Sequence, residues 1–173
     1  MKTNGARFLD SHGVHYEIRE YEVDPEEFSA ILVAEKVGLP AEQVFKTLLC
    51  VTGDREHLFA VIPGDAELDF KKLAHAAGVR KVEMVSLKEV QPLTGYVRGS
   101  VTVFGAKTDF PVYVDETVEL FDVISVSAGA RGVQIVLSPA DYLRASKAAL
   151  ADLTKDIRPQ EVGHGKISPE PRR

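Results

Sequence analysis

The sequence is poor in cysteine and tryptophan and has no long apolar run. Its 173 residues include one cysteine and no tryptophan. With Cys50 alone, the chain cannot form an internal disulfide or a cysteine cluster that binds zinc. No stretch approaches the roughly 18 consecutive apolar residues that span a bilayer, and residues 1–13 lack the apolar core of a secretory signal. We therefore expect a cytoplasmic protein with no membrane partner.

Basic residues are too few for a general nucleic-acid-binding protein. Lys and Arg number 21 against 26 Asp and Glu, which gives a formal net charge of −5. Proteins that bind nucleic acid through many phosphate contacts usually carry excess positive charge. The balance argues against DNA as a partner and leaves a weak or local RNA contact open. The basic cluster Lys71, Lys72, Arg80 and Lys81 fits such a contact, and it also fits the commoner case of a solvated helix face.

Standard catalytic motifs are missing as well. The five histidines are scattered, and none has the spacing of an HExxH metal site. The chain has no GxxxxGK[ST] phosphate loop and no GxSxG nucleophile motif. Cys50 lies in an apolar run and is more typical of a small core residue than of a nucleophile. We expect neither metal nor cofactor, and an enzyme of this sequence would work by binding and positioning its substrate.

The hydrophobic patterns predict an α+β fold. Strand patterns occur at 14–23, 44–51 and 58–63, and short β-type runs follow at 95–105, 110–115, 122–129 and 132–138. Helix signals mark residues 3–13, 25–38, 69–78, 86–93 and 138–153, with Pro25 at the start of the second helix and a Ser86/Glu89 capping box at the fourth.

Because strands and helices do not alternate strictly, we expect a compact single domain with a central mixed, mostly antiparallel sheet flanked by short helices. The domain should span residues 3–156. Residues 157–173 hold several prolines and few apolar side chains, which predicts a flexible C-terminal tail.

A lysine stands inside the most apolar run of the chain, VFKTLLCV at residues 44–51. In a strand, Phe45, Thr47 and Leu49 share one face, whereas Lys46 and Cys50 share the other. Both faces are mainly apolar, which predicts a central strand. Lys46 then either extends its ammonium group to an edge or a carboxylate, or lines a cavity that holds an anionic or carbonyl-bearing ligand. The pattern alone leaves both readings open.

Two glycine-containing stretches could also approach a ligand. Gly99 lies among β-branched residues, where the backbone can come close to a bound molecule. Ser127 precedes Gly129 in a turn of small residues, and a hydroxyl beside backbone N–H groups can bind an oxygen anion. An ordinary structural turn has the same composition.

Four blocks of the sequence stand out together: VFKTLL, LDFKKLAHAAGVRKVEM, TGYVRGSVTVFGAKTDFPVYVDE and ISVSAGARGVQIVL. In this order they resemble the YbaK-type editing family, the bacterial Cys-tRNA(Pro) deacylases and related aminoacyl-tRNA deacylases, and the resemblance covers roughly residues 3–153. The family fold is a compact α+β domain around a mixed sheet. The resemblance implies a trans-editing hydrolase that cleaves the ester joining a wrong amino acid to tRNA(Pro), with prolyl-tRNA synthetase as a partner.

The resemblance also implies roles for individual residues. Lys46 would bind near the phosphate–ribose end of the CCA terminus and hold the scissile ester, with Gly99 and Ser127 completing the catalytic set. Positions that match the family's substrate pocket and loop are Tyr21, Phe28, Thr47, Ser100, Thr102, Gly129 and Gln134. Candidate phosphate contacts are Lys71, Lys72, Arg80, Lys81, Arg98, Lys107 and Arg131.

The substrate loop departs from the family pattern. The family usually reads Gly-Gly-Ile-Ser-Pro where this chain has GSVTV, so Ser100, Thr102 and Val103 replace a glycine, a serine and a proline. Gln134 stands where the family often has an acid. These changes bear on which aminoacyl group is removed, cysteine, alanine or another, more than on the fold or the ester chemistry.

The family offers two routes that need no protein nucleophile. The thiol of a cysteinyl ester attacks its own carbonyl, or a water attacks with help from a terminal ribose hydroxyl. Two other functions remain in view: a non-catalytic module that binds tRNA or a synthetase, and an enzyme that forms a Schiff base on Lys46.

Overall fold

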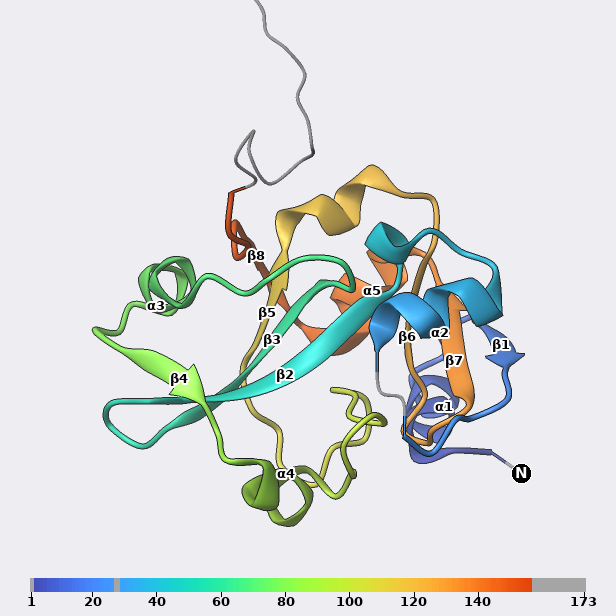
Figure 1. Ribbon diagram of the computed structural model, residues 1–173, viewed down its shortest axis with the longest axis horizontal. Coiled ribbons are helices and arrows are strands. Elements are labelled where there is room, and N and C mark those ends of the chain that lie inside the picture. Colours follow the sequence, from blue (N-terminus) through green and yellow to red (C-terminus); the bar gives the residue numbers. More distant parts are fainter. Residues whose placement is uncertain (1, 27–28, 157–173) are drawn as a thin grey trace, which may run out of the picture.

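A computed structural model describes residues 2–26 and 29–156 of the chain. Figure 1 shows short helices arranged around two groups of strands. The α-helices are α1 (Asn4–Ser11), α2 (Ala30–Val37), α3 (Phe70–Ala77), α4 (Leu87–Thr94) and α5 (Pro139–Ser146), and the 3₁₀ helices are η1 (Ala41–Gln43) and η2 (Glu116–Leu120). The strands are β1 (Glu17–Glu20), β2 (Phe45–Thr52), β3 (His57–Pro63), β4 (Val82–Met84), β5 (Val112–Asp115), β6 (Ile124–Ser127), β7 (Val133–Leu137) and β8 (Ala149–Ala151).

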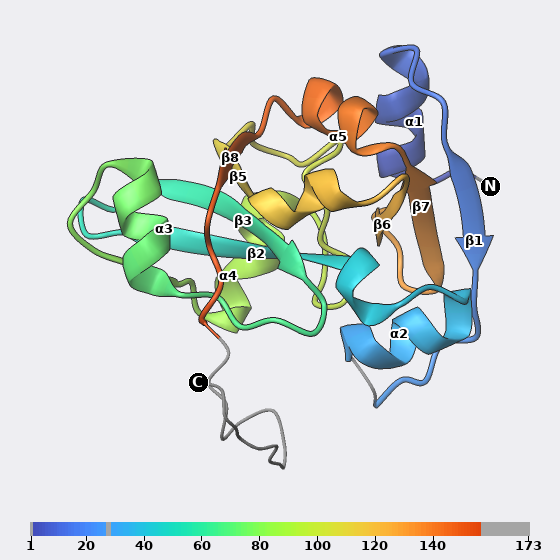
Figure 2. The ribbon, with the colours of Figure 1, turned by 90° about the horizontal axis from the view of Figure 1, so that it is seen from above.

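The strands form two sheets that lie at opposite sides of the molecule in Figures 1 and 2. One sheet has the order β1-β7-β6 and is antiparallel, and the other has the order β4-β2-β3-β5-β8. In the second sheet, β4, β2 and β3 pair antiparallel, whereas β5 and β8 continue it in parallel. A parallel bridge between Val44 and Ser125 joins the two sheets. The predicted α+β class with a mixed, mostly antiparallel arrangement is confirmed, with the strands divided between two sheets.

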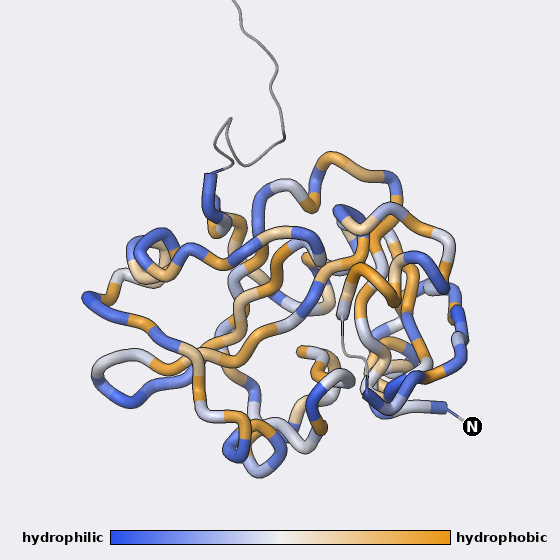
Figure 3. The backbone as a smooth tube through the Cα atoms, viewed as in Figure 1, coloured by the Kyte–Doolittle hydropathy of each residue, from blue (hydrophilic) through white to orange (hydrophobic). Residues whose placement is uncertain are grey.

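The strand β2 is central because apolar cores cover both of its faces. Phe45 and Leu49 join the larger core around Phe59, and Cys50 joins a second core beneath α3 that includes Leu73. Figure 3 shows the hydrophobic colour concentrated along the inner strands and the hydrophilic colour on outer helices and turns. Burial raises the pKa of the Cys50 thiol to about 12, as expected of a core cysteine.

Local signals place most helix ends where the sequence predicts them. The Asp69 carboxylate accepts hydrogen bonds from the first backbone N–H groups of α3, and Ser138 caps α5 in the same way. Gly38 and Gly78 end α2 and α3 in the left-handed conformation, at φ of 80° and 70°. These helices therefore begin and end for reasons visible in a few neighbouring residues.

Three of the predicted elements differ in the structure. The second helix begins at Ala30 after a Ser29 cap, not at Pro25. The stretch 95–105 is a series of turns and not a strand, since its chain folds back until the Tyr96 hydroxyl donates to the Phe104 carbonyl at 2.6 Å. The last helix ends at Ser146, and residues Ala149–Ala151 form β8.

At the fourth helix, Ser86 precedes α4, but its side chain makes no capping hydrogen bond, so the predicted capping box is not formed. The predicted tail, residues 157–173, lies outside the described residues. Within the described part of the chain, no helix is long and apolar enough to cross a membrane.

Candidate active site

A cavity of about 600 Å³ opens where β2 begins, between α2, α4 and the loop at residues 98–101. This volume lies within the range of about 300–1,000 Å³ found for small-molecule sites. Most lining side chains are apolar. The polar and charged lining residues are Tyr21, Ser29, Lys46, Thr47, Arg98, Ser127 and Gln134. Among the described lining residues there is no Asp, Glu, His or Cys, so Lys46 and Tyr21 are the lining side chains that could transfer a proton.

Lys46 lies on β2, half-buried, with its side chain in the wall of this cavity. Its Nζ donates a hydrogen bond to the Gly64 carbonyl oxygen at 3.2 Å. That bond uses one of the three ammonium protons, so two remain for a ligand. No carboxylate of the described residues lies within ion-pair distance of Lys46. The position fits the cavity reading of this lysine and not the ion-paired one.

The surroundings of Lys46 act on its charge in opposite directions. Removal from water lowers the pKa of the ammonium group, and the carboxylates of Asp65 and Glu67 partly oppose this effect. A partly desolvated cation interacts more strongly with a phosphate or a polarised carbonyl than one in bulk water. Lys46 is therefore well placed to bind an anionic or carbonyl oxygen.

Gly64 holds Lys46 and was not identified from the sequence. A Cβ atom at Gly64 would lie 2.7 Å from the Val44 carbonyl oxygen and 2.9 Å from the Ala30 Cβ. Only glycine lets this segment approach β2 and α2 so closely. The one available signal was a glycine directly after the strand that pairs with β2.

Gly99 and Tyr21 both line the cavity, and their contact with a substrate stays a prediction. Gly99 has φ of 89°, a conformation that favours glycine, in the exposed loop between Arg98 and Ser100. Tyr21 follows β1 and also lines a small neighbouring pocket together with Gly99. Thr47 contributes to the wall from β2. Phe28 lies outside the described residues.

The hydroxyl group of Ser127 is already engaged. It donates its proton to the Ser100 carbonyl at 2.8 Å and accepts a hydrogen bond from the Gly129 N–H at 3.1 Å. A serine nucleophile needs a neighbouring base that accepts its proton, whereas the Ser127 proton is given to a backbone carbonyl. The Ser127 hydroxyl therefore links the substrate loop to the β6–β7 turn through these two hydrogen bonds.

Three other residues assigned to the substrate pocket do not line the cavity. Ser100 is buried and its hydroxyl donates to the Val97 carbonyl at 2.9 Å. Thr102 is buried and its hydroxyl accepts from the Phe104 N–H at 3.4 Å. A Cβ on Gly129 would lie 2.8 Å from the Tyr96 ring. Their interactions shape the loop and turn, and direct contact with a substrate stays a prediction for all three.

Gln134 lies in the cavity wall with a fixed side chain. It belongs to β7, is 6% exposed, and its Oε1 accepts a hydrogen bond of 2.6 Å from the Ser125 hydroxyl. Ser125, Ser127 and Gln134 share one face of the smaller sheet, opposite the face that carries Ile124 and Ile135 into the core. Ser127 and Gln134 of this row line the cavity, whereas Ser125 is fully buried.

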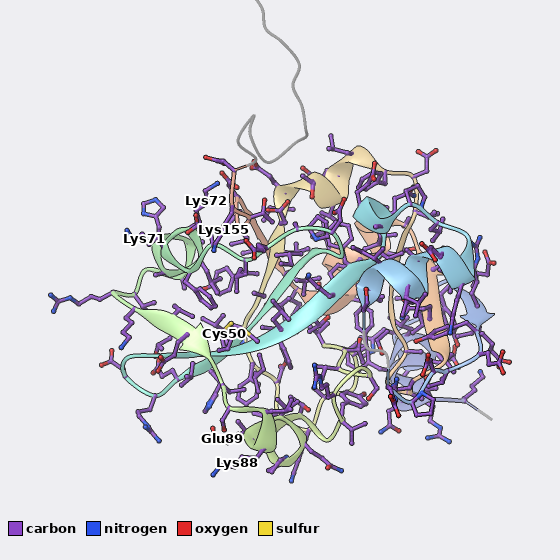
Figure 4. All side chains as sticks on the ribbon, viewed as in Figure 1. Cys50, Lys71, Lys72, Lys88, Glu89 and Lys155 are labelled. Carbon is purple, nitrogen blue, oxygen red and sulfur yellow. The ribbon has the colours of Figure 1, made fainter. Side chains whose placement is uncertain are left out.

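The basic residues predicted to contact tRNA fall into two groups. Arg98 lines the cavity, and Arg131 lies beside it, donating to the Asp24 carbonyl at 2.9 Å. The others lie on or next to α3, as Figure 4 shows for two of them, and do not line the cavity; they are Lys71, Lys72, Arg80 and Lys81. Lys107 is exposed in the loop before β5.

Lys72 already has protein partners on the α3 side. It forms ion pairs with Asp152 at 3.0 Å and Asp156 at 2.9 Å, which raise the pKa of the lysine. In this arrangement it holds the C-terminal segment against α3. A phosphate contact by Lys72 would have to compete with both carboxylates, and the tRNA contacts of all these residues stay predictions.

The mouth of the cavity carries apolar residues that sequence reasoning missed. Ile31, Met84 and Leu87 line the cavity, yet they are 49%, 43% and 59% exposed. They come from α2, β4 and α4, so only the folded chain brings them together. No local sequence signal distinguishes them from ordinary core residues.

Known proteins resemble this chain over most of its length. The family model described as the aminoacyl-tRNA editing domain matches residues 24–145, which include every cavity-lining element except Tyr21. The "Putative Cys-tRNA(Pro)/Cys-tRNA(Cys) deacylase EbsC" of Enterococcus faecalis is 42% identical over 154 residues, covering 89% of this chain and 94% of that protein. The "Multifunctional Ser/Thr-tRNA deacylase ProXp-y" of Escherichia coli K12 is 30% identical over 127 residues, covering 71% and 76%.

A solved structure supports the fold independently. The crystal structure described as "a putative trans-editing enzyme for prolyl tRNA synthetase" superposes with a TM-score of 0.78 at 24% identity, covering 90% of this chain and 99% of that one. The match to the family model and the similarity to the Enterococcus protein confirm the resemblance seen in the sequence. The chain belongs to the aminoacyl-tRNA editing domain family.

Proposed function

We propose that this protein is a trans-editing deacylase that hydrolyses mischarged aminoacyl-tRNA, with tRNA(Pro) carrying a wrong amino acid as the favoured substrate. The observation that carries the proposal is the open cavity of about 600 Å³ with the Lys46 ammonium group in its wall. Such a cavity has room for the terminal adenosine and its aminoacyl ester. The family supplies the reaction type, and the relatives named above are described as aminoacyl-tRNA deacylases.

In this proposal, the protein catalyses by orientation. Two free protons of Lys46 bind the phosphate–ribose end or the ester carbonyl, and the backbone at Gly99 donates to the oxyanion that develops on that carbonyl. We assign the attacking group to the substrate or the solvent, because no described lining residue is an Asp, Glu, His or Cys and the Ser127 proton is already given to the Ser100 carbonyl.

Two routes satisfy this requirement. With a cysteinyl ester, the substrate sulfur bonds to the carbonyl carbon, the bond from that carbon to the ribose oxygen breaks, and the ribose oxygen takes up a proton. With another aminoacyl ester, a water oxygen makes the same attack while a neighbouring ribose hydroxyl orients it. Both routes release tRNA with a free terminal ribose.

Delivery of the tRNA by a synthetase in the cytoplasm is part of the proposal. The net charge of −5 predicts weak binding of tRNA by the isolated chain. A prolyl-tRNA synthetase that holds the same tRNA would raise the effective concentration of the ester at the cavity. Addition of the synthetase should therefore lower KM more than it raises kcat.

The test is deacylation of tRNA(Pro) charged separately with cysteine, alanine, serine and proline. Loss of at least one mischarged ester, with protection of the prolyl ester, is the expected result. Saturable binding of these RNAs with no ester cleavage would instead support the non-catalytic binding module. Trapping of a carbonyl compound on Lys46 by borohydride would be needed to support a Schiff-base enzyme.

A further inference from the structure

The amide of Gln134 presents a hydrogen-bond donor to the cavity. Its Oε1 accepts the proton of the Ser125 hydroxyl at 2.6 Å. Ser125 is 0% exposed, and this is the one acceptor found for its proton among the described residues. With the amide reversed, that buried proton would have no acceptor. The oxygen therefore faces Ser125, and the Nε2 group faces the cavity that Gln134 lines.

This donor has no partner in residues 2–26 and 29–156. The Ser125 bond engages only the oxygen of the Gln134 amide, which leaves both Nε2 protons unpaired in a side chain that is 6% exposed. The neighbouring hydroxyl of Ser127 cannot serve as a donor to a ligand, because its proton is already given to the Ser100 carbonyl. Gln134 is thus the donor that this wall of the cavity offers to a bound aminoacyl group.

The charges around the cavity have one sign. Lys46 from β2 and Arg98 from the 98–101 loop line it, and no described lining residue carries a carboxylate. Asp65 and Glu67, which act on Lys46 through their charge, are exposed and lie in the turn after β3. On β1, Arg19 pairs opposite Gln134 but binds the Glu17 carboxylate and the Val37 carbonyl.

An aminoacyl ester carries an α-amino group that is protonated or neutral near pH 8, because such groups have pKa values of about 7.7–8.0. The ammonium form would meet cations and the N–H protons of Gln134, and no described carboxylate in the wall. The neutral form can accept a hydrogen bond from Nε2. An α-hydroxyl group is also uncharged and can accept the same bond.

We infer that the cavity binds esters whose α-substituent is uncharged, with Gln134 Nε2 donating to a neutral α-amino nitrogen or to an α-hydroxyl oxygen. The protein would therefore have a second substrate class, α-hydroxyacyl-tRNA. In that hydrolysis, the water oxygen bonds to the carbonyl carbon, the carbon–ribose oxygen bond breaks, and the ribose oxygen receives the proton. The inference rests on the proposed deacylase activity and specifies what that site accepts.

The test compares matched pairs of esters on the same tRNA(Pro). The aminoacyl ester that is hydrolysed fastest is paired with its α-hydroxy counterpart, lactate for alanine, glycerate for serine or 3-mercaptolactate for cysteine. Each kcat/KM is divided by the spontaneous hydrolysis rate of that ester, because the α-substituent alters intrinsic reactivity. The wild-type ratio of aminoacyl to hydroxyacyl values should stay below about ten. A ratio above ten would overturn the inference.

Two variants separate charge recognition from general damage. Gln134→Glu keeps an acceptor for the Ser125 hydroxyl and places a carboxylate in the cavity wall. It should raise the ratio of aminoacyl to hydroxyacyl kcat/KM values by about tenfold to a hundredfold, because this is the range for a hydrogen bond to a charged group. Gln134→Met removes the donor without adding charge and should lower both values by about tenfold, leaving the ratio unchanged.

The outcomes distinguish this inference from the function on which it rests. If the wild type cleaves no aminoacyl ester, the proposed function fails. If it cleaves aminoacyl esters but the Glu variant keeps the wild-type ratio, or the Met variant loses activity toward one ester alone, the inference fails and the deacylase function stands. Thermal unfolding shows whether each variant is folded. If Gln134→Glu is not folded, the result with Gln134→Met decides.

Discussion

Replacing Lys46 with methionine should remove most of the deacylation activity while leaving the fold intact. Lys46 has two ammonium protons available in the cavity after its bond to the Gly64 carbonyl. A hydrogen bond from a charged donor contributes about 1.5–3 kcal/mol, which corresponds to roughly a 10- to 150-fold loss in kcat/KM. Methionine keeps a side chain of similar length, so the cavity wall is preserved.

The same change should have little effect on stability. Lys46→Met loses one hydrogen bond to Gly64, which costs on the order of 1 kcal/mol. It also removes a half-buried charge, whose desolvation opposes folding and lowers the pKa of the lysine. Because the two effects have opposite sign, the free energy of unfolding should change by less than about 1 kcal/mol.

The assay measures kcat/KM on mischarged tRNA(Pro) together with urea unfolding of the same preparations. Lys88→Met is the matched control, because Lys88 is an exposed lysine on α4 that does not line the cavity, and Figure 4 shows its position. We expect Lys88→Met to behave as the wild type. Turnover by Lys46→Met within about threefold of the wild type, in a folded protein, would refute the placement of Lys46 at the reacting ester.

Three further predictions concern stability and reactivity. Gly129→Ala should destabilise the fold by about 2–4 kcal/mol in urea unfolding, because Gly129 has φ of 100° and its Cβ would lie 2.8 Å from the Tyr96 ring. Gly53→Ala, whose nearest neighbouring atom would be 3.9 Å away, should change stability by less than about 0.5 kcal/mol. Burial lowers the pKa of Lys46 in the folded protein below its ordinary 10.5, so between the folded and unfolded pKa values the unfolded chain binds more protons. The free energy of unfolding should therefore rise with pH across that window, while the rate of deacylation, corrected for spontaneous hydrolysis, falls. An equal dependence of stability on pH in Lys46→Met would contradict this. Cys50, 0% exposed with a pKa of about 12, should react with iodoacetamide about a hundredfold more slowly in the native protein than in urea, and equal rates would show that its strand opens readily.

The sequence predicts the elements whose signals are local. Asp69 and Gly78 mark the two ends of α3 in the structure as in the sequence, since a cap needs only neighbouring backbone groups. The alternating residues of β2 predict a strand covered on both faces, and the cores around Phe45 and Cys50 confirm it. The resemblance gives the family correctly.

Features that depend on distant parts of the chain could not be predicted in the same way. The residues at 95–105 have strand-like composition, yet Gly99 and Gly105 adopt φ of 89° and 72° and the stretch folds into turns. The position of Lys46 depends on Gly64, which is 18 residues away and is brought near by the β2–β3 register. The orientation of the Gln134 amide, with Oε1 toward Ser125, depends on a residue in the neighbouring strand.

The segment after α5 affects how the gene can be trimmed for expression. The family match ends at residue 145, but Leu153 is fully buried, its N–H donates to the Asp115 carboxylate, and its carbonyl accepts from Asp69. At the other end, β1 lies before the match and pairs with β7, which carries Gln134. A recombinant fragment cut to residues 24–145 would therefore expose the edges of β5 and β7 to aggregation, and tags are better placed before residue 3 or after residue 156.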